Sequence, residues 1–323
     1  MKLSSLMTAI ALLFGSAWFS IAFSQSYPSK PIRLVVPFPP GGVHDTVSRI
    51  LQPRFSEGLG QQILIENRPG AGGNIAADAV AKSPPDGYTV LVATDSVGVG
   101  PHLYRDTSLR TFKDFAAITK LASYPMALVC SPGFPSSTVG ELVARAKSMP
   151  GKITGASPGS GTSNHLVTEL FKSTADIDLL HIPFKGAGPA MTEVMAGRVD
   201  CIFITPAVWM PQVRSGKVKV LAVAAAARIS LAPDIPTFAD SGYPGFQAEV
   251  FTGLAASAAT PALIVERLYR ESVRTIRLPE TQARLAELGA TATASTPAEF
   301  SESLRRDYER WGKVIRDSGI KGD

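Results

Sequence analysis

Two glycine-rich turns, each between a strand-like run and a helix-like run, constrain the fold of this chain more than any other feature. The first turn follows the apolar run 32–37, and the second follows the run 152–156. A helix that begins after such a turn presents backbone N–H groups without an acceptor inside the helix, at the positive end of its dipole. This arrangement suits a carboxylate or a phosphate. Two such turns, far apart in sequence, predict two lobes that close on one small anion.

We call residues 38–44 the first cradle and residues 157–163 the second cradle. The candidate ligand-binding residues in them are Phe38, Pro40, Gly41, Gly42, Val43 and His44, and Ser157, Gly159, Ser160, Gly161, Thr162 and Ser163.

Residues 1–24 have the pattern of a cleavable secretory signal. Lys2 gives a positive start, the stretch 6–21 is apolar, and small residues precede Gln25. We expect cleavage near Ser24 and Gln25, and hence an exported protein. An uncleaved anchor is the alternative, but the apolar stretch is shorter than the roughly 20 residues that a membrane span needs.

Strand-like and helix-like runs alternate through the first two thirds of the mature chain, which predicts parallel sheets with crossover helices. The strand-like runs are 32–37, 63–66, 88–93, 127–130, 153–156, 179–182, 201–204, 218–224 and 249–255. The helix-like runs are 46–59, 74–82, 139–148, 163–174, 189–196, 262–276, 280–288 and 297–318.

The last helix-like run, 297–318, has apolar residues at spacings of three and four, and such a stripe needs a partner surface. We expect this helix to dock back on the first lobe. The prediction is a discontinuous lobe I, 25–122 and 225–323, and a continuous lobe II, 123–224. Strands near 118–129 and 218–226 would then cross between the lobes as a hinge, and clefts between domains are preferred ligand sites.

The composition excludes several classes of function. The formal net charge is +5, but Lys and Arg are scattered and form no stripe with aromatic residues, so nucleic acid is not expected as a partner. The histidines are too dispersed for a metal site, and no cofactor is expected. For the two cysteines, Cys130 and Cys201, we expect buried free thiols. A disulfide is the alternative, if their strands are neighbours.

Several short motifs in order along the mature chain resemble one known family, the periplasmic substrate-binding proteins of tripartite tricarboxylate transporters, or Bug receptors. These motifs are YPSKPI at 27–32, VPFPPGG at 36–42 with Asp45, ENRPGAGGN at 66–74, PDGYT at 85–89, GSGTSNH at 159–165, HIPFKG at 181–186 and SGYPGF at 241–246.

The resemblance implies a two-lobed type II periplasmic-binding-protein fold, in which two sheets flanked by helices are joined by a two-strand hinge. It implies a monomeric, non-enzymatic receptor that holds a small organic acid in the cleft and delivers it to a membrane permease. Backbone amides, hydroxyls and waters would hold the carboxylate. The remaining walls of the site would come from Thr94, Asp95, Ser96, Phe184, Lys185, Gly186, Ile204 and Thr205.

The chain departs from the usual pattern of the family in three ways. His44 replaces a small or hydroxyl residue and would make binding pH-sensitive if its pKa were near the usual 6.5; the alternative is a solvated loop side chain. Ile204 stands where many relatives carry an acid that meets a ligand amine, which disfavours amino acids as ligands. Phe184 and Phe251 stand where Tyr and Trp are common, which predicts an apolar wall.

Two further roles and two other functions complete the predictions. Asp45 is expected to cap backbone N–H groups and His165 to support the second cradle, rather than to touch the ligand. A sensory binding protein that signals to a membrane kinase would look the same in sequence. An exported esterase would use the G-x-S-x-G pattern at Ser157, but Pro158 has no N–H to donate to an oxyanion.

Overall fold

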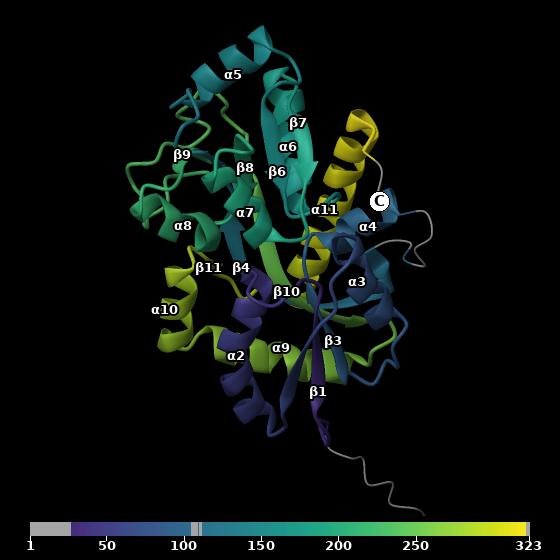
Figure 1. Cartoon of the computed structure of the whole chain (residues 1–323). Coiled ribbons are helices and arrows are strands. Elements are labelled where there is room, and N and C mark those ends of the chain that lie inside the picture. The colour runs from purple at the N-terminus through teal and green to yellow at the C-terminus, as the bar shows by residue number, and fades with distance from the viewer. Residues whose placement is uncertain (1–26, 105–108, 110–111, 321–323) are drawn as a thin grey trace, which may run out of the picture.

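The computed structural model describes residues 27–104, 109 and 112–320, and Figure 1 shows the arrangement of their helices and strands. The predicted signal segment 1–24 and its cleavage position lie outside the described residues. Among the described residues, no helix is both long and apolar enough to cross a membrane.

The first of two sheets has six strands in the order β11-β4-β10-β3-β1-β2. β1 runs parallel to β2 and β3, and β10 lies between β3 and β4, antiparallel to both. Its strands are β1 (Ile32–Val36), β2 (Ile63–Asn67), β3 (Thr89–Ala93), β4 (Phe115–Pro125), β10 (Glu249–Ser257) and β11 (Thr291–Ala292). The helices in the same parts of the chain are α2 (Val43–Leu59), α3 (Asn74–Ala81), α4 (Ser96–Leu103), α9 (Ala262–Ile276), α10 (Pro279–Glu287) and α11 (Pro297–Ser318), with 3₁₀ turns η1 (Ala71–Gly73) and η2 (Phe112–Asp114).

The second sheet has five strands in the order β7-β6-β8-β5-β9. β6 runs parallel to β7 and β8, whereas β5 is antiparallel to β8 and β9. Its strands are β5 (Ala127–Cys130), β6 (Thr154–Ser157), β7 (Leu180–Pro183), β8 (Cys201–Ile204) and β9 (Lys219–Val223). Its helices are α5 (Val139–Ser148), α6 (Ser163–Ala175), α7 (Ala187–Met195) and α8 (Pro206–Arg214). The prediction of an α/β fold with two helix-flanked sheets is confirmed.

Three segments meet where the chain passes between the sheets. The N–H of Met126 donates to the carbonyl of Ala248 (2.8 Å), that of Ala248 to Ala224 (2.9 Å), and that of Ala224 to Met126 (2.7 Å). The expected strand over 118–129 is therefore two strands, β4 and β5, separated at Met126. A closed ring of three backbone hydrogen bonds fixes the crossing segments to one another while the sheets on either side remain separate.

Residues 225–247 pack with the second sheet rather than with the first. Phe238 lies against Phe171 of α6 and Phe203 of β8, with ring centroids 5.4 and 5.8 Å away. Phe246 joins the same cluster, 4.5 Å from Phe238. This packing favours a return to the first lobe at Ala248 rather than at 225.

The C-terminal helix α11 has the amphipathic stripe expected from its sequence. Thr296 and Glu299 form a capping box at its start. Phe300, Leu304 and Trp311 are buried along one face. The helix packs on β4 and α4 and also reaches α6, so it bridges the two sheets (Figure 1).

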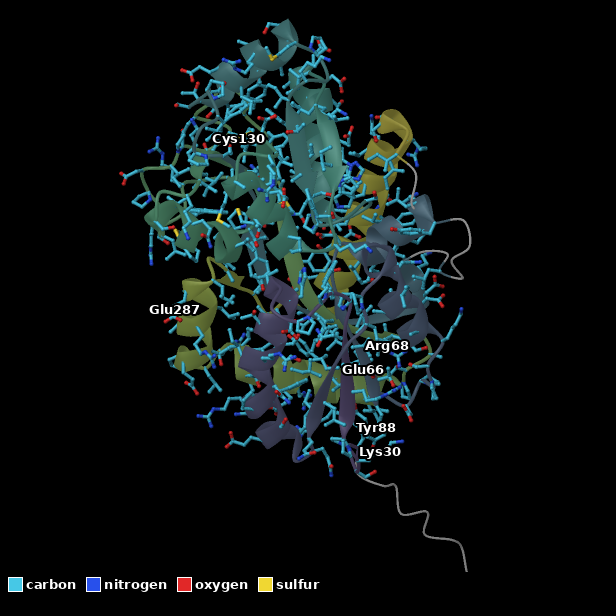
Figure 2. The ribbon with its side chains drawn as sticks, viewed as in Figure 1. Lys30, Glu66, Arg68, Tyr88, Cys130 and Glu287 are labelled. Atoms are coloured by element: carbon cyan, nitrogen blue, oxygen red, sulfur yellow. A yellow bond between two sulfur atoms is a disulfide. The ribbon has the colours of Figure 1, made fainter. Side chains whose placement is uncertain are left out.

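The expectation of free thiols is wrong, because Cys130 and Cys201 form a disulfide. β5 and β8 are antiparallel neighbours, and their register places these two residues directly opposite each other. Both lie at the strand ends remote from Met126, in the upper part of the molecule where Figure 2 labels Cys130. The crosslink therefore lies within the second sheet, away from the crossing.

Candidate functional site

In both sheets, the carboxyl ends of the parallel strands lie next to the crossing at Met126. In the first sheet, β1 and β3 run in the same direction as β4, which ends at Pro125. In the second sheet, β8 ends at Ile204, opposite Ala127 of β5, and β6 and β7 run with β8. Ligands of open α/β sheets bind at these strand ends. Both predicted cradles follow such an end.

The first cradle connects β1 to α2 as the sequence predicts, although α2 begins at Val43, three residues earlier than expected. Gly41 has a φ of +84°, which favours glycine. Gly42 is the N-cap residue with extended dihedrals, φ −74° and ψ 165°. The N–H groups of Val43 and His44 belong to the first helical turn and have no acceptor within α2.

Asp45 holds the turn of the first cradle through hydrogen bonds to its carboxylate. Its carboxylate accepts hydrogen bonds from the Gly41 N–H (2.9 Å), from Asn67 Nδ2 (3.0 Å) and from both Nε and Nη2 of Arg49 (2.9 Å each). Burial acts to raise the pKa of Asp45, but the hydrogen bonds from Arg49, Gly41 and Asn67 outweigh it and hold the pKa below its usual value. This carboxylate is fully engaged within the chain, so its geometry supports a structural role.

The second cradle repeats the same design between β6 and α6. Gly161 has a φ of +73°, and Thr162 is the N-cap residue with φ −72° and ψ 158°. The Gly161 N–H donates to Nδ1 of His165, four residues later, at 3.2 Å. In the first cradle, Gly41 donates to Asp45 across the same spacing. In both cradles a side chain from the first helical turn holds the glycine, and the first N–H groups of the helix have no acceptor within it.

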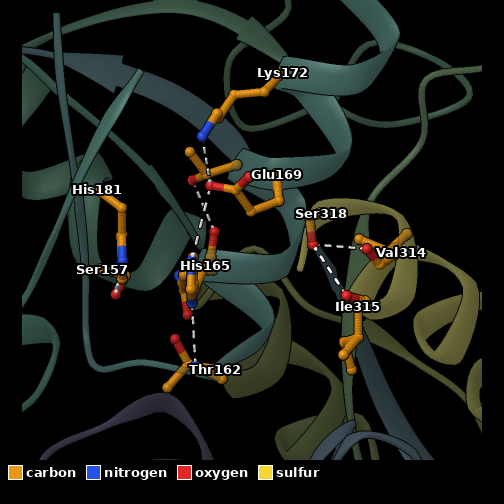
Figure 3. Close-up of polar contacts among 12 residues, drawn as sticks. Ser157, Thr162, His165, Glu169, Lys172, His181, Val314, Ile315 and Ser318 are labelled. Carbon is orange, nitrogen blue, oxygen red and sulfur yellow. Dashed lines mark hydrogen bonds and ion pairs between the residues drawn. The ribbon is translucent and has the colours of Figure 1, made fainter. Parts of the chain in front are cut away.

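His165 belongs to a buried polar network that the sequence did not predict. Its ring stacks on that of His181, with centroids 3.6 Å apart, and its Nε2 lies 3.9 Å from Glu169 Oε1 (Figure 3). Glu169 in turn contacts Lys172 at 3.0 Å. Because a backbone N–H can only donate, His165 Nδ1 carries no proton and the ring is the neutral Nε2–H tautomer. Burial, then the nearby His181 and Lys172, lower the pKa of His165 to about 3.

Ser157 also contacts a histidine. Its Oγ lies 2.7 Å from His181 Nε2, 3.2 Å from the Gly159 nitrogen and 3.0 Å from the Gly159 carbonyl oxygen. The serine is fully buried, and Pro158 offers no N–H to an oxyanion. The contact is therefore that of a serine that closes the turn, and it gives no support to the esterase alternative. Within the described residues, no group of three or more His, Cys, Asp or Glu could hold a metal ion.

His44 is half-buried and contacts two residues of the first sheet. Its Nδ1 lies 2.8 Å from Thr252 Oγ1, which is 3.1 Å from Tyr124 Oη. The ring stacks on Phe38, with centroids 5.2 Å apart. Burial lowers the pKa of His44 to about 4, so the ring is neutral at pH 6 to 8. The pH-sensitive alternative requires a pKa near 6.5, and the contacts of the ring with Phe38 and Thr252 do not favour that value.

The other predicted residues follow strand ends at the same edges. Thr94 and Asp95 follow β3 and are buried. Asp95 accepts a hydrogen bond from Ser163 Oγ, which joins the first sheet's edge to the second cradle. Ser96 begins α4, and its side chain lies outside the described part of the structure. The rest follow β7 and β8: Phe184, Lys185 and Gly186 after β7, and Thr205 after Ile204, the last residue of β8.

Two observations differ from the sequence interpretation of the walls. Phe251 is buried against Phe300 of α11, with centroids 5.5 Å apart, so it belongs to the core and not to the wall. The segment 70–73, which is absent from the predicted walls, reaches the second cradle: a Cβ on Gly72 would lie 3.4 Å from the Gly161 carbonyl oxygen and 3.3 Å from Tyr104 Oη. Tyr104, Tyr124 and Thr252 were missed because no local pattern marks them.

The chain matches one family model and several known proteins. The family model described as "Tripartite tricarboxylate transporter family receptor" matches residues 47–320. Among curated proteins, the chain is similar to Protein BugT of Bordetella pertussis, with 33% identity over 325 residues that cover 99% of each chain.

Three solved structures are similar over nearly their whole length. The periplasmic binding protein BugD is 31% identical, with a TM-score of 0.84 over 91% of this chain and 99% of that one. Rpa4515 of R. palustris with adipate is 31% identical, with a TM-score of 0.85 over 91% and 99%. MatC of Rhodopseudomonas palustris with bound malate is 32% identical, with a TM-score of 0.83 over 90% and 100%.

Proposed function

Because this chain belongs to the tripartite tricarboxylate transporter receptor family, we propose that it captures a small carboxylate between its two lobes. It is a solute-binding receptor of a tripartite transporter, with the fold of the periplasmic binding proteins. The observation that supports a carboxylate best is the pair of cradles, each braced by a side chain of its own helix and each at a carboxyl edge beside the crossing. The related structures with adipate and malate support the same class of ligand.

The ligand would be held mainly by backbone N–H groups. Val43 and His44 at the start of α2, and Ser163 and Asn164 at the start of α6, offer donors that no acceptor within the helices satisfies. A hydrogen bond to a charged acceptor contributes about 1.5–3 kcal/mol. A few such bonds offset the cost of ordering a small acid and give micromolar affinity or better.

The proposed binding surface keeps the residues predicted from the sequence, with two changes of role. Phe38, Pro40, Gly41, Gly42, Val43 and His44 form one side, with Thr94, Asp95 and Ser96; Ser157, Gly159, Ser160, Gly161, Thr162, Ser163, Phe184, Lys185, Gly186, Ile204 and Thr205 form the other. Ser157 contributes through its contact with His181, and Asp95 accepts a hydrogen bond from Ser163 of the second cradle. Asp45 and His165 support the cradles by accepting hydrogen bonds from Gly41 and Gly161.

We place the second lobe at 126–247 and the first lobe at the flanking parts of the mature chain. Closure would rotate the lobes about the ring formed by Met126, Ala224 and Ala248. The receptor would act in the periplasm as a monomer, after removal of its signal segment, and would perform no chemistry on its ligand. Its partner would be the membrane permease.

Ligand-induced thermal stabilisation tests this function. The mature protein would be unfolded and refolded to remove any carried-over ligand, then screened against mono-, di- and tricarboxylates, with matched amides as controls. Because a ligand that binds only the native state raises the unfolding temperature, a few related acids should give a shift and their amides none. Equal shifts with the amides, or no shift with any acid, would contradict the proposal.

A further inference from the structure

The contact between Asp95 and Ser163 places a carboxyl group beside a cradle built for carboxylates. Ser163 is the first residue of α6, and its Oγ donates to Asp95 Oδ2. The Ser163 N–H is one of the donors that the second cradle offers. A ligand carboxylate in this cradle would therefore be a near neighbour of Asp95, and two ionised carboxylates that share one site repel each other.

A second acid, Asp307 of α11, lies close enough for its charge to act on Asp95. Gly98, one turn along α4, packs so closely on α11 that a Cβ there would lie 3.1 Å from the Tyr308 nitrogen and 3.3 Å from the Asp307 carbonyl carbon. Burial, and then the charge of Asp307, raise the pKa of Asp95 to about 7. Burial likewise raises the pKa of Asp307 to about 6.

The cations and imidazoles near this acid pair do not neutralise it. Lys120 of β4 and Arg310 of α11 lower the pKa of Asp95, as does the bond from Ser163, but burial and Asp307 outweigh them. On the packed helices, His165 of α6 and His102 of α4 have pKa values that burial lowers, and neither supplies a positive charge at neutral pH. The charge of Arg306 acts to lower the pKa of Asp307.

We propose that Asp95 takes part in ligand capture as a neutral carboxylic acid, so that the receptor takes up one proton when a carboxylate occupies the second cradle. The protonated group would donate its O–H toward the ligand while its other oxygen accepts from Ser163. Ligand binding raises the proton affinity of Asp95 further, and by linkage protonation of Asp95 strengthens ligand binding. This inference rests on the proposed function and adds that the receptor binds an ionised acid together with one proton.

The sign of the pH dependence follows from the direction of proton uptake. Above the pKa of Asp95 in the free receptor, each ligand binds with about one proton, so the Kd rises roughly tenfold per pH unit. Below it, Asp95 is already neutral and the Kd is flat. The carboxyl groups of malate and adipate titrate below pH 6.5, so their own titration does not produce this dependence.

Isothermal titration calorimetry in buffers of different ionisation enthalpy counts the protons. The probes are malate and adipate first, then the other acids of the screen, at pH 6.5 to 8.5. The wild type should take up about one proton at pH 8. Asp95→Asn keeps the shape of the side chain and should take up none, with a flat Kd. Asp317→Asn, an exposed acid on α11, should behave as the wild type.

Asp307→Asn gives a second, independent variant. Removal of its charge should lower the pKa of Asp95, so that the rise in Kd begins at a lower pH while the proton count at pH 8 stays the same. Binding by the wild type with no proton uptake, or the same uptake in Asp95→Asn, would overturn this inference and leave the proposed function standing. No binding of any carboxylate would overturn both.

Discussion

Gly42→Ala separates ligand binding from folding at the first cradle. Gly42 has φ −74° and ψ 165°, which any residue adopts, and an added Cβ would meet only the Pro39 carbonyl oxygen, at 3.6 Å. Alanine is a poorer N-cap than glycine, by up to about 1 kcal/mol. It also restricts the unfolded chain, which stabilises by about 0.4–1 kcal/mol. The free energy of unfolding should therefore change by less than about 1 kcal/mol.

The same methyl group should weaken ligand binding strongly. It enters the open space beside the first turn of α2, where the account places the carboxylate. Loss of one hydrogen bond to a charged acceptor costs about 1.5–3 kcal/mol. At about 1.4 kcal/mol per factor of ten, the Kd should rise by roughly ten- to a hundredfold.

Calorimetric titration and urea unfolding of the same samples measure both quantities. Gly140→Ala is the matched control, because Gly140 lies on the exposed side of α5 and an added Cβ there meets nothing within 4 Å. It should leave the Kd unchanged. Gly161→Ala is not a clean test, since its Cβ would lie 2.5 Å from Leu103 Cδ1. A Gly42→Ala protein with wild-type stability and wild-type affinity would refute the cradle account.

Three further outcomes follow from single features of the structure. Replacement of both Cys130 and Cys201 by alanine should lower the free energy of unfolding by about 4 kcal/mol, because the crosslink closes a loop with a sequence separation of 71. The Kd should not change. Equal urea midpoints for the wild type and the variant would contradict this prediction. His165→Asn keeps an acceptor for the Gly161 N–H but does not titrate. The unfolded wild type binds a proton at His165 below pH 6.5, and the native state only near pH 3. The wild type should therefore lose free energy of unfolding relative to this variant as the pH falls from 6.5 to 3. A constant difference in the free energy of unfolding would exclude the buried neutral imidazole. Gly41→Ala forces a φ of +84° on alanine and should cost about 1–2 kcal/mol in urea unfolding, although nothing lies within 4 Å of the new Cβ; an unchanged midpoint would show that the turn relaxes.

The sequence predicted those parts of the fold that local patterns encode. The strand, glycine turn and helix start at each cradle lie where expected, because φ values above zero at Gly41 and Gly161 leave a direct mark on the sequence. α11 was predicted over its full range, since its apolar stripe is regular. α4 and α8 were missed: Gly98, Gly100 and Pro101 in α4, and two prolines in α8, are poor helix formers that tertiary packing holds in helices.

No local sequence pattern marks the contacts between distant segments of the chain. The strand order β6-β8-β5 brings Cys130 opposite Cys201, and nothing in either short run specifies that order. His165 and His181 stack because β6 and β7 are parallel neighbours. The bond from Ser163 to Asp95 depends on how the two sheets lie across the crossing. These contacts set the electrostatics around the two cradles, and no short run of the sequence encodes them.

A crystal structure of the mature protein with a carboxylate that stabilises it tests the central claim most directly. We predict carboxylate oxygens within hydrogen-bond distance of the backbone N–H groups at the start of α2 and of α6, with both lobes in contact with the ligand. A ligand held by an arginine side chain, or bound on one lobe away from the crossing, would contradict it.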